Sequence, residues 1–380
     1  MSDTPISIAL PRSKSIVIRC LIVQYLKTGK LLPVFKNDPN DIKIVYNALK
    51  KIESSKKSNA ALQSEIVIDV EDCGAAYRFL MAVLATTKGR WLLRGYQRLL
   101  QRPIQPLASF LIEQGAIIQN TESGWIIEGR ELQIDDFEID SSETSQFASA
   151  IMMVRELITE KGKKQKTESR KENPYILMTQ SIINQFDDFM NMVKLADWSA
   201  AAFWIAHALL TPNAHYLLKD LHFDGLQGDA EIVPWFEKWG VSFIENKKGI
   251  EVKHTQQISI PEQQIDVAKT PDIAMILAVL AVCYPFQLTL TGLKNINLKE
   301  SNRLDILVKE LTKFTSIIVQ SENKIIIHKR KKELPLLFNF DSYQDHRFVM
   351  AWSLFKKFGE VKIKDEQCVK KSYPGFCSKG

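Results

Sequence analysis

The sequence lacks the hallmarks of secreted, membrane-spanning and metal-rich proteins. No basic segment followed by an apolar one stands at its start, and its longest apolar run, 273–283, is too short to cross a bilayer. The five cysteines are odd in number and show no CxxC spacing, which argues against a disulfide framework or a zinc site. We therefore expect a cytoplasmic protein with reduced thiols and no bound metal.

The chain also lacks a strong excess of charge of either sign. It has 50 Lys and Arg against 44 Asp and Glu, a formal net charge of +6, which suits small anionic ligands as well as nucleic acid. Its polar stretch 159–173 and its basic run 328–332 have no interleaved aromatic residues, unlike surfaces that bind single-stranded nucleic acid. We expect a solvated loop at the first and a strand end with a turn at the second. Charge alone assigns no partner.

Apolar residues, by contrast, are plentiful. They make up 45% of the 380 residues, so we expect two domains with sizeable cores. Six segments that are apolar on nearly every side begin with small, polar or charged residues, which is typical of a buried helix with a polar N-terminus. These starts are 13–15, 73–76, 145–146, 197–199, 271–272 and 345–347. Because a helix N-terminus carries unsatisfied N–H donors and partial positive charge, six such ends could line a site for anions.

An extended segment, a polar turn, an amphipathic helix and a second strand follow one another at several places. The clearest copies run over 89–118, 215–243 and 286–319. In two of them Gly115 or Gly240 stands where a helix C-terminus favours glycine. Repeats at this spacing predict a duplicated supersecondary unit rather than a single doubly wound sheet. We therefore predict an α/β fold of repeated βαβ-type units in two pseudo-equivalent domains.

The segment 293–304 concentrates polar chemistry beside an apolar helix. It contains Asn295, Lys299, Glu300 and Arg303. A carboxylate between a lysine and an arginine is either a general acid or base among anion-binding cations or the solvated start of a helix. The segment alone favours the second interpretation, and the motifs elsewhere in the chain favour the first.

Nine short motifs follow one another along the chain: PRSKSIVIR, DCGAAYRFL, QRPI, SQF, PYILMT, PDIAM, NINLKESNR, DHR and KKSYP. Each is weak alone, but the ordered set resembles the 5-enolpyruvylshikimate-3-phosphate synthase family, the enolpyruvyl transferases of the shikimate pathway, over nearly the whole chain. The resemblance implies two domains, each an inside-out α/β barrel of three repeated units with buried parallel helices. The domains would be 13–195, with one unit truncated near 180–196, and 1–12 plus 196–380, with the active site in the cleft between them.

The resemblance also implies two sets of substrate-binding residues. Shikimate 3-phosphate would bind Lys14, Ser15, Arg19, Thr144, Ser145, Gln146, Tyr175, Asp272, Asn295 and Lys299. Phosphoenolpyruvate would bind Lys14, Gly74, Arg102, Gln146, Arg303, Arg347 and Lys371. The residue types agree with this division, because the planar fork of arginine grips carboxylate and phosphate through two bonds. We expect no cofactor, no metal, no nucleic-acid or membrane partner, and a monomer.

The implied reaction is an addition followed by an elimination. The 5-hydroxyl of the first substrate attacks C2 of phosphoenolpyruvate while C3 accepts a proton, and phosphate then leaves. Such a route needs a base for the hydroxyl and an acid for the methylene carbon, with the roles exchanged in the second half. The resemblance places Asp272 at the hydroxyl and Glu300 near the carbon, with Lys14 stabilising charge on the transferred group.

The sequence departs from the family pattern at single positions. The family's glycine, asparagine, threonine, proline and aspartate are replaced by Arg12, Ile18, Ala75, Phe79 and Asn302. Two of these replacements, Ala75 and Phe79, stand behind Gly74 in the region assigned to phosphoenolpyruvate. Because the herbicide glyphosate inhibits the family in that region, we expect reduced sensitivity to it.

Two further departures concern a segment and a charge. Only 17 residues separate Thr179 from Asp197, where the family carries a further helix–strand–strand passage. Glu172 falls where a phosphate-binding serine is expected. Like charges at about 4 Å repel by roughly 1 kcal/mol in water and by more when desolvated. We therefore expect Glu172 to turn away from the phosphate and Ser169 or Arg170 to take its place.

Three other interpretations stay open. The sister enzyme that transfers enolpyruvyl to UDP-N-acetylglucosamine uses a loop cysteine, which the corresponding stretch 97–102 lacks. A non-catalytic or altered-specificity ligand-binding paralogue is compatible with the shortened segment, but the expected catalytic residues are intact. An RNA-binding protein with related repeats would bind weakly, without sequence preference and with a steep dependence on salt.

Overall fold

The computed structural model describes residues 4–132, 134, 138–158, 173–185, 192–256 and 259–378. It divides into two compact units: the N-terminal unit, Lys14–Val193, and the C-terminal unit, formed by Met1–Ser13 and Lys194–Gly380. The stretch 159–172, which includes Ser169, Arg170 and Glu172, lies outside the described residues, as do residues 186–191 of the shortened segment.

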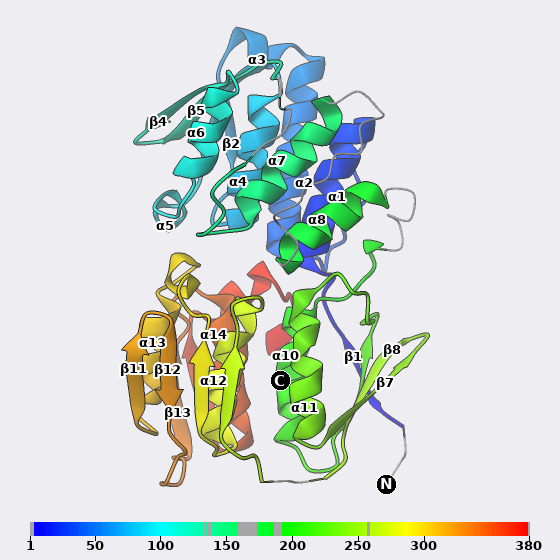
Figure 1. The fold of residues 1–380 in the computed structure, drawn as a ribbon. Coiled ribbons are helices and arrows are strands. Elements are labelled where there is room, and N and C mark those ends of the chain that lie inside the picture. The colour runs from blue at the N-terminus through cyan, green and yellow to red at the C-terminus, as the bar shows by residue number, and fades with distance from the viewer. Residues whose placement is uncertain are drawn as a thin grey trace. The chain divides into compact units, whose positions relative to one another are not determined.

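Among the described elements one order occurs three times: strand, helix, strand, helix, strand, strand (Figure 1). Short helical turns interrupt this order, and in one copy the whole N-terminal unit is inserted between β1 and α10. The N-terminal unit contains β2 (Ile66–Asp69), α4 (Gly74–Ala85), β3 (Gly89–Arg94), α6 (Gln105–Glu113), β4 (Ile117–Thr121) and β5 (Gly124–Gly129). The C-terminal unit contains β1 (Ile6–Ala9), α10 (Trp198–Leu209), β6 (His215–Lys219), α11 (Val233–Lys238), β7 (Val241–Asn246) and β8 (Gly249–His254). The second copy of this order in the C-terminal unit consists of β9 (Gln263–Asp266), α12 (Ala274–Cys283), β10 (Leu288–Thr291), α13 (Arg303–Leu311), β11 (Ile317–Ser321) and β12 (Lys324–Ile327). The predicted repetition is thereby confirmed.

The three copies build the same four-stranded sheet. Their strand orders are β2-β3-β5-β4, β1-β6-β8-β7 and β9-β10-β12-β11. In each sheet the first two strands pair in parallel, and the last two add as an antiparallel hairpin. Gly124 and Gly249 begin the last strand of two copies at positive φ, and a Cβ on either would lie within 2.3 Å of the carbonyl oxygen of Leu93 or Leu218. Only glycine fits this close approach to the neighbouring strand.

A shorter βαβ unit completes the C-terminal unit. β13 (Leu337–Asp341) and β14 (Glu360–Lys364) pair in parallel, and α14 (His346–Trp352) lies between them in the chain. The ring of Trp352 stacks on Phe340 and on Phe348, with 4.6 and 5.0 Å between ring centroids. This packing fixes the helix whose second residue is Arg347.

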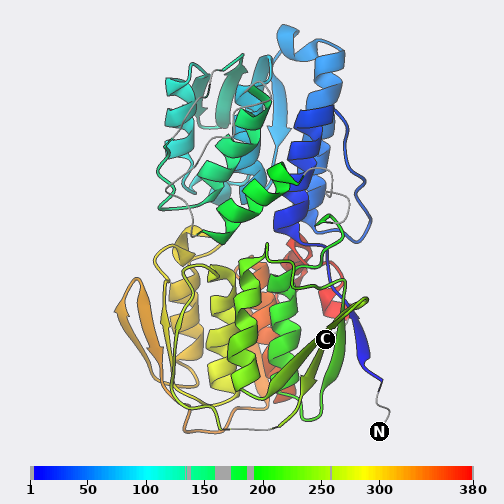
Figure 2. The ribbon, with the colours of Figure 1, turned by 45° about the vertical axis from the view of Figure 1, so that its right-hand side comes forward.

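One helix of each copy is buried in the core of its unit. In the C-terminal unit α10, α12 and α14 lie side by side, with the strands around them (Figures 1 and 2). Every residue of α12 and α14 is buried, as expected for a helix that is apolar on all sides. In the N-terminal unit α1 (Lys14–Thr28), α4, α7 (Gln146–Ile158) and α8 (Pro174–Asn184) pack together. The structure confirms the predicted α/β fold of repeated units with buried helices.

All six predicted helix starts are present. Five of the helices begin at or directly after the predicted polar residues, and α12 follows the 3₁₀ turn η3 (Pro271–Ile273). Asp197 and Asp345 cap α10 and α14 by accepting the N–H groups of Ala200 and Arg347. The remaining elements are α2 (Asn40–Lys57), α3 (Ala60–Gln63), α5 (Gln97–Leu100), η2 (Gly228–Ile232), η4 (Ile296–Leu298), η5 (Ser353–Lys357), η6 (Glu366–Lys371) and η7 (Phe376–Ser378). The described helices include none with the length and apolarity that a bilayer crossing requires.

Candidate active site

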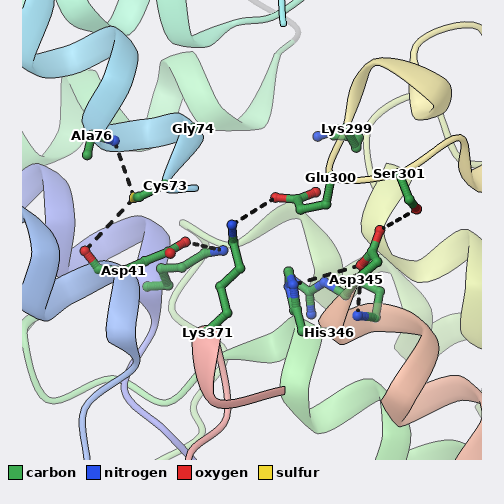
Figure 3. Close-up of polar contacts among 12 residues, drawn as sticks. Asp41, Cys73, Gly74, Ala76, Lys299, Glu300, Ser301, Asp345, His346 and Lys371 are labelled. Atoms are coloured by element: carbon green, nitrogen blue, oxygen red, sulfur yellow. Dashed lines mark hydrogen bonds and ion pairs between the residues drawn. The ribbon is translucent and has the colours of Figure 1, made fainter. Parts of the chain in front are cut away.

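The carboxylate of Asp345 organises the polar cluster of the C-terminal unit. Asp345 is completely buried at the start of α14 and accepts the backbone N–H of Arg347 at 2.9 Å. Its Oδ2 accepts a hydrogen bond from Ser301 Oγ at 2.9 Å (Figure 3) and another from Arg303 Nε at 2.8 Å. A buried carboxylate is costly unless it is paired and hydrogen-bonded. These contacts therefore hold the starts of α13 and α14 together.

Arg303, at the start of α13, binds three carboxylates and its side chain is only 1% exposed. Besides its contact with Asp345, NH1 donates to Asp272 Oδ1 at 2.8 Å and NH2 donates to Glu300 Oε2 at 2.9 Å. Burial lowers the pKa of Arg303, but the three carboxylates raise it by more, so that the net shift is upward. The guanidinium of Arg303 therefore stays charged, and it binds both candidate catalytic carboxylates, Asp272 and Glu300.

Asp272, in η3, lies among three cations. Its oxygens are 2.8 Å from Arg303 NH1, 2.9 Å from Arg347 NH2 and 3.9 Å from Lys299 Nζ. Burial raises the pKa of Asp272, but Arg347, Lys299 and Arg303 lower it by more, and the net pKa is well below the ordinary value. Asp272 is therefore ionised at neutral pH, as a general base must be.

Two guanidinium nitrogen atoms of Arg347 are unpaired in the part of the chain that the structure describes. Its NH2 binds Asp272, whereas Nε and NH1 are buried and have no hydrogen-bond partner among the described residues. A buried donor without a partner costs about 1–3 kcal/mol, so such an arrangement is typical of a ligand site. The planar guanidinium suits a carboxylate or a phosphate.

Glu300 and Lys371 extend the same cluster. The Nζ of Lys371 lies 3.9 Å from Oε1 of Glu300, and both side chains are largely buried (Figure 3). Lys371 ends η6, and Tyr373 beyond it is anchored because its hydroxyl donates to the carbonyl of Ala9 at 3.0 Å and accepts from Trp204 Nε1 at 3.2 Å. The last part of the chain thereby brings a lysine to the carboxylate of the segment 293–304.

A side chain outside the predicted set fixes the turn that carries Lys299 and Glu300. Asn297, in η4, accepts the backbone N–H of Leu304 on its Oδ1 at 2.8 Å. Asn297 therefore caps α13 although it lies seven residues before Leu304 in the chain. The same hydrogen bond holds the turn 297–304 closed. Asn295 lies at the head of η4, so the predicted polar residues of this segment share one turn.

In the N-terminal unit an acidic residue that the sequence did not single out holds Lys14. Lys14 begins α1, and its Nζ lies 3.0 Å from Oδ2 of Asp41, which is 3% exposed. Asp41 stands in the first turn of α2, where the helix dipole favours a carboxylate. The thiol of Cys73 lies 4.0 Å from the carbonyl oxygen of Asp41 and accepts the N–H of Ala76 at 3.4 Å (Figure 3). The starts of α1, α2 and α4 are thereby joined.

Gly74 leaves room for the guanidinium of Arg102. A Cβ on Gly74 would lie 2.6 Å from NH1 and 2.9 Å from Cζ of Arg102. Arg102 follows α5 and is only 9% exposed. Two residues that the resemblance assigns to phosphoenolpyruvate are therefore in direct contact, and glycine is needed here for packing rather than for backbone freedom.

Arg78, one helical turn after Gly74, connects the loop of Arg102 to Gln146. Its Nε and NH2 donate to the carbonyl of Pro103 at 3.1 and 2.9 Å. Its NH1 donates to Gln146 Oε1 at 2.8 Å and to the carbonyl of Gly74 at 3.4 Å. The sequence interpretation missed Arg78, although an arginine four residues after the glycine of the DCGAAYRFL motif was the available signal.

Arg19 is buried among side chains of the N-terminal unit. Its Nε donates to Thr179 Oγ1 at 2.7 Å and its NH2 donates to Ser149 Oγ at 3.4 Å. Its NH1 donates to the carbonyl of Ser15 at 2.9 Å, and its Cζ lies 6.0 Å from the ring centroid of Tyr175. Burial lowers the pKa of Arg19 to about 10, so the side chain stays charged at neutral pH.

Thr144 and Ser145 precede α7 and shape its start. Thr144 Oγ1 accepts the N–H of Gln146 at 3.3 Å, and the carbonyl of Ser145 accepts the N–H of Ser149 at 3.1 Å. The predicted site residues in the N-terminal unit are Lys14, Ser15, Arg19, Gly74, Arg102, Thr144, Ser145, Gln146 and Tyr175. Those in the C-terminal unit are Asp272, Asn295, Lys299, Glu300, Arg303, Arg347 and Lys371.

Comparison with known proteins gives one consistent result. The chain matches the family described as EPSP synthase (3-phosphoshikimate 1-carboxyvinyltransferase) over residues 8–192 and 189–379. It is 28% identical to the 3-phosphoshikimate 1-carboxyvinyltransferase of Bacteroides fragilis, over 99% of this chain and 94% of that protein. It is 27% identical to the enzyme of the same name from Clostridium kluyveri, over 97% and 92%. Its fold is similar to that of EPSP synthase from Acinetobacter baumannii, with a TM-score of 0.66 at 18% identity over 98% of this chain and 94% of that chain.

Proposed function

The chain belongs to the EPSP synthase family, and from this premise we propose how its residues divide the reaction. As a 3-phosphoshikimate 1-carboxyvinyltransferase it transfers the enolpyruvyl group of phosphoenolpyruvate to the 5-hydroxyl of shikimate 3-phosphate and releases phosphate. The reaction is a step of the shikimate pathway to the aromatic amino acids. One observation carries the proposed roles: Asp272 binds Arg347 through NH2, while Nε and NH1 of that arginine are buried without a partner among the described residues.

Phosphoenolpyruvate, in this proposal, binds Arg347 through Nε and NH1. Both atoms carry N–H donors that have no partner among the described residues, and an anion that accepts hydrogen bonds from them offsets the cost of burying them. Lys371 adds a second cation to the same cluster. The remaining phosphoenolpyruvate ligands are Lys14, Gly74, Arg102, Gln146 and Arg303.

Substrate binding then makes Asp272 a better base. Three cations hold its pKa well below the ordinary value, and a carboxylate with so low a pKa is a weak base. An anion bound to Arg347 weakens the electrostatic stabilisation that this guanidinium gives to the ionised carboxylate of Asp272. The pKa of Asp272 therefore rises when phosphoenolpyruvate binds, and Asp272 can take the proton of the 5-hydroxyl.

The steps balance with Glu300 as the second carboxyl group. In the addition, the hydroxyl oxygen forms a bond to C2, the hydroxyl proton goes to Asp272, and Glu300 gives a proton to C3. In the elimination, Glu300 takes a proton back from C3 while the bond from C2 to the phosphate oxygen breaks, and Asp272 gives its proton to the departing phosphate. Arg303 and Lys371 fix Glu300 through Oε2 and Oε1, so the same carboxyl group can serve in both halves.

Lys14 stabilises the charge that develops on the transferred group. Its Nζ is held by the buried carboxylate of Asp41. The pairing keeps an ammonium group at the start of α1, where the partial positive charge of the helix adds to its attraction for anions.

Shikimate 3-phosphate binds a second set of groups. Among the described residues Arg19 uses three of its five N–H donors, which leaves two that a phosphate oxygen could accept. Tyr175 lies beside Arg19. The remaining ligands are Lys14, Ser15, Thr144, Ser145, Gln146, Asp272, Asn295 and Lys299. We further propose that the two compact units are the two substrate-binding domains expected from the sequence, and that both contribute to each substrate.

Membership of this family is also the basis for proposing the binding partners and the cellular compartment of the protein. We propose a cytoplasmic monomer that acts on these two small substrates without a cofactor. A non-catalytic paralogue would not need two candidate catalytic carboxylates bound to one buried arginine. In this protein Asp272 and Glu300 both bind Arg303.

Phosphate release tests the proposed roles. The purified protein should release phosphate only when both substrates are present. Asp272→Asn should lower kcat by about 10²- to 10⁴-fold, the usual contribution of a general base, while substrate binding changes much less. Asp220→Asn is the matched control, because Asp220 is exposed and asparagine tolerates its positive φ. Equal losses in both variants, or no loss in either, would rule out Asp272 as the base.

A further inference from the structure

A buried carboxyl group that the mechanism does not use lies in η2 of the C-terminal unit. Asp229 is 4% exposed, and its Oδ2 accepts a short hydrogen bond from Ser199 Oγ. Its Oδ1 is buried and has no hydrogen-bond partner among the described residues. Within the same described residues no lysine, arginine or histidine lies at ion-pair distance from Asp229. An ionised carboxylate in such surroundings is strongly disfavoured.

The chain holds Asp229 in place through Gln227, which lies two residues earlier. Gln227 donates from Nε2 to the carbonyl of Ala196 at 3.0 Å and accepts the N–H of Trp198 on Oε1 at 3.2 Å. These bonds fasten η2 to the start of α10, where Ser199 stands. η2 also packs against η3, which carries Asp272. Asp229 therefore cannot turn out to solvent.

The charged groups that face Asp229 come from three elements. They are Asp197 at the start of α10, Asp272 in η3 and Arg347 in α14. α11 packs against η2 as well, but its charged residues Glu237 and Lys238 are exposed. Two of the three facing groups are thus carboxylates, and the single cation already binds one of them through NH2.

We propose that Asp229 is kept as a neutral carboxylic acid on Ser199, so that the guanidinium of Arg347 remains available to the anionic group of phosphoenolpyruvate. This inference rests on the proposed role of Arg347 as a phosphoenolpyruvate ligand. Asp229 touches no reacting atom in this account and is a positioning residue. If ionised, it would be a further carboxylate competing with the substrate for the unpaired N–H groups of Arg347.

The proton affinity of the group agrees with this role. Burial and the charge of Asp272 raise the pKa of Asp229, whereas the hydrogen bond from Ser199 and the charge of Arg347 lower it, and the net pKa is about 7. The acid is therefore neutral in slightly acidic solution and loses its proton as the pH rises above about 7. Affinity for phosphoenolpyruvate should weaken over the same range.

The test is the pH dependence of KM for phosphoenolpyruvate in the wild type and in Asp229→Asn. Asparagine has the shape of the neutral acid and cannot ionise. From about pH 6.5 to 8.5 the wild-type KM should rise by roughly twentyfold relative to that of the variant, as expected for loss of one proton with a pKa near 7. Comparing the two proteins on the same substrate cancels the titration of phosphoenolpyruvate itself and of Asp272. Parallel pH profiles would overturn the proposal, and so would a KM already raised tenfold in the variant at the acidic end.

Infrared difference spectroscopy between the two proteins gives a readout that needs no activity. The wild type should show the carbonyl stretch of a protonated carboxyl group at slightly acidic pH, and the band should be absent from Asp229→Asn. If the wild type shows no transferase activity but has the band, the proposed function fails while the protonation of Asp229 stands. If the enzyme is active and the band is missing, the inference about Asp229 alone is wrong.

Discussion

Arg303 Nε lies 2.8 Å from Asp345 Oδ2, and both side chains are almost completely buried in the C-terminal unit. The pair joins two motifs that are distant in the sequence, NINLKESNR and DHR. Asp345 caps α14 and so orients Arg347, whereas Arg303 binds Asp272 and Glu300. One buried ion pair therefore connects the anion-binding arginine to both candidate catalytic carboxylates.

The first prediction concerns the stability of this pair. Asp345→Ala leaves Arg303 buried without its best partner and removes the cap of α14, so it should lower the free energy of unfolding by about 3–5 kcal/mol. Urea unfolding measures the change. Asp345→Asn, which keeps an acceptor for the Arg347 N–H, should cost less. A loss below about 1 kcal/mol in the alanine variant would mean that the pair does not hold the cluster together.

A second prediction concerns proton transfer at C3. Glu300→Gln should lower kcat by about 10²- to 10⁴-fold, because glutamine cannot give or take the proton. When the reaction runs in D₂O, the variant should also incorporate far less deuterium into the methylene group of phosphoenolpyruvate. Glu262→Gln is the control, since Glu262 is exposed. Wild-type deuterium incorporation in Glu300→Gln would assign the C3 proton to another group.

Gly74 provides a third prediction. In Gly74→Ala the new Cβ would lie 2.6 Å from Arg102 NH1, so the guanidinium must move. The KM for phosphoenolpyruvate should rise by about tenfold, the value of one ordinary hydrogen bond to a charged group. The fold should persist, since alanine suits the first turn of α4 better than glycine does. An unchanged KM with a normally folded variant would show that Arg102 does not bind this substrate.

A fourth prediction concerns glyphosate. Phe79 stands where the family has proline, and its ring lies 5.1 Å from Arg19 Cζ, so it packs α4 against α1. Together with Ala75 it changes the helix that begins at Gly74, and we expect weak inhibition. The inhibition constant should be compared with that of a family member that carries the threonine and proline. An equally tight constant for this protein would contradict the expectation.

The pH dependence of stability provides a fifth prediction. The folded pKa of Asp229 is about 7, whereas the unfolded value is about 4. The folded state thus binds this proton more tightly, and the resulting stability is complete below about pH 4 and is lost as the pH rises through 7. Asp229→Asn has no such loss. Between pH 5 and 8 the free energy of unfolding of the wild type should fall by about 1–3 kcal/mol relative to the variant; a constant difference would show that Asp229 is ionised throughout.

Helix starts and repeated units could be predicted from the sequence because their signals are local. Apolar residues on every side of a segment mark a buried helix, and Asp197 or Asp345 before such a segment marks its N-terminus. The order of strands and helices in the three repeated copies could be predicted for the same reason, because strand and helix patterns alternate along the chain. The motifs also singled out Asp272, Glu300, Arg303, Arg347 and Lys371, which the structure places in one cluster.

Contacts between distant segments could not be predicted in this way. Arg78 bonds to Gln146, Lys14 pairs with Asp41, and Asn297 caps α13 without adjoining it. Nothing in the local pattern around these residues shows which partner the fold brings to them. The role proposed for Asp229 depends on the absence, among the described residues, of a cation at ion-pair distance from its carboxyl group, which only the three-dimensional arrangement shows.

The most direct test of the account is to follow ¹³C-labelled phosphoenolpyruvate by NMR in the presence of shikimate 3-phosphate and the purified protein. The account predicts that one enol ether at the 5-position and one inorganic phosphate form together, and that neither forms when shikimate 3-phosphate is left out. Phosphate without the enol ether, or no product at high enzyme concentration, would contradict it.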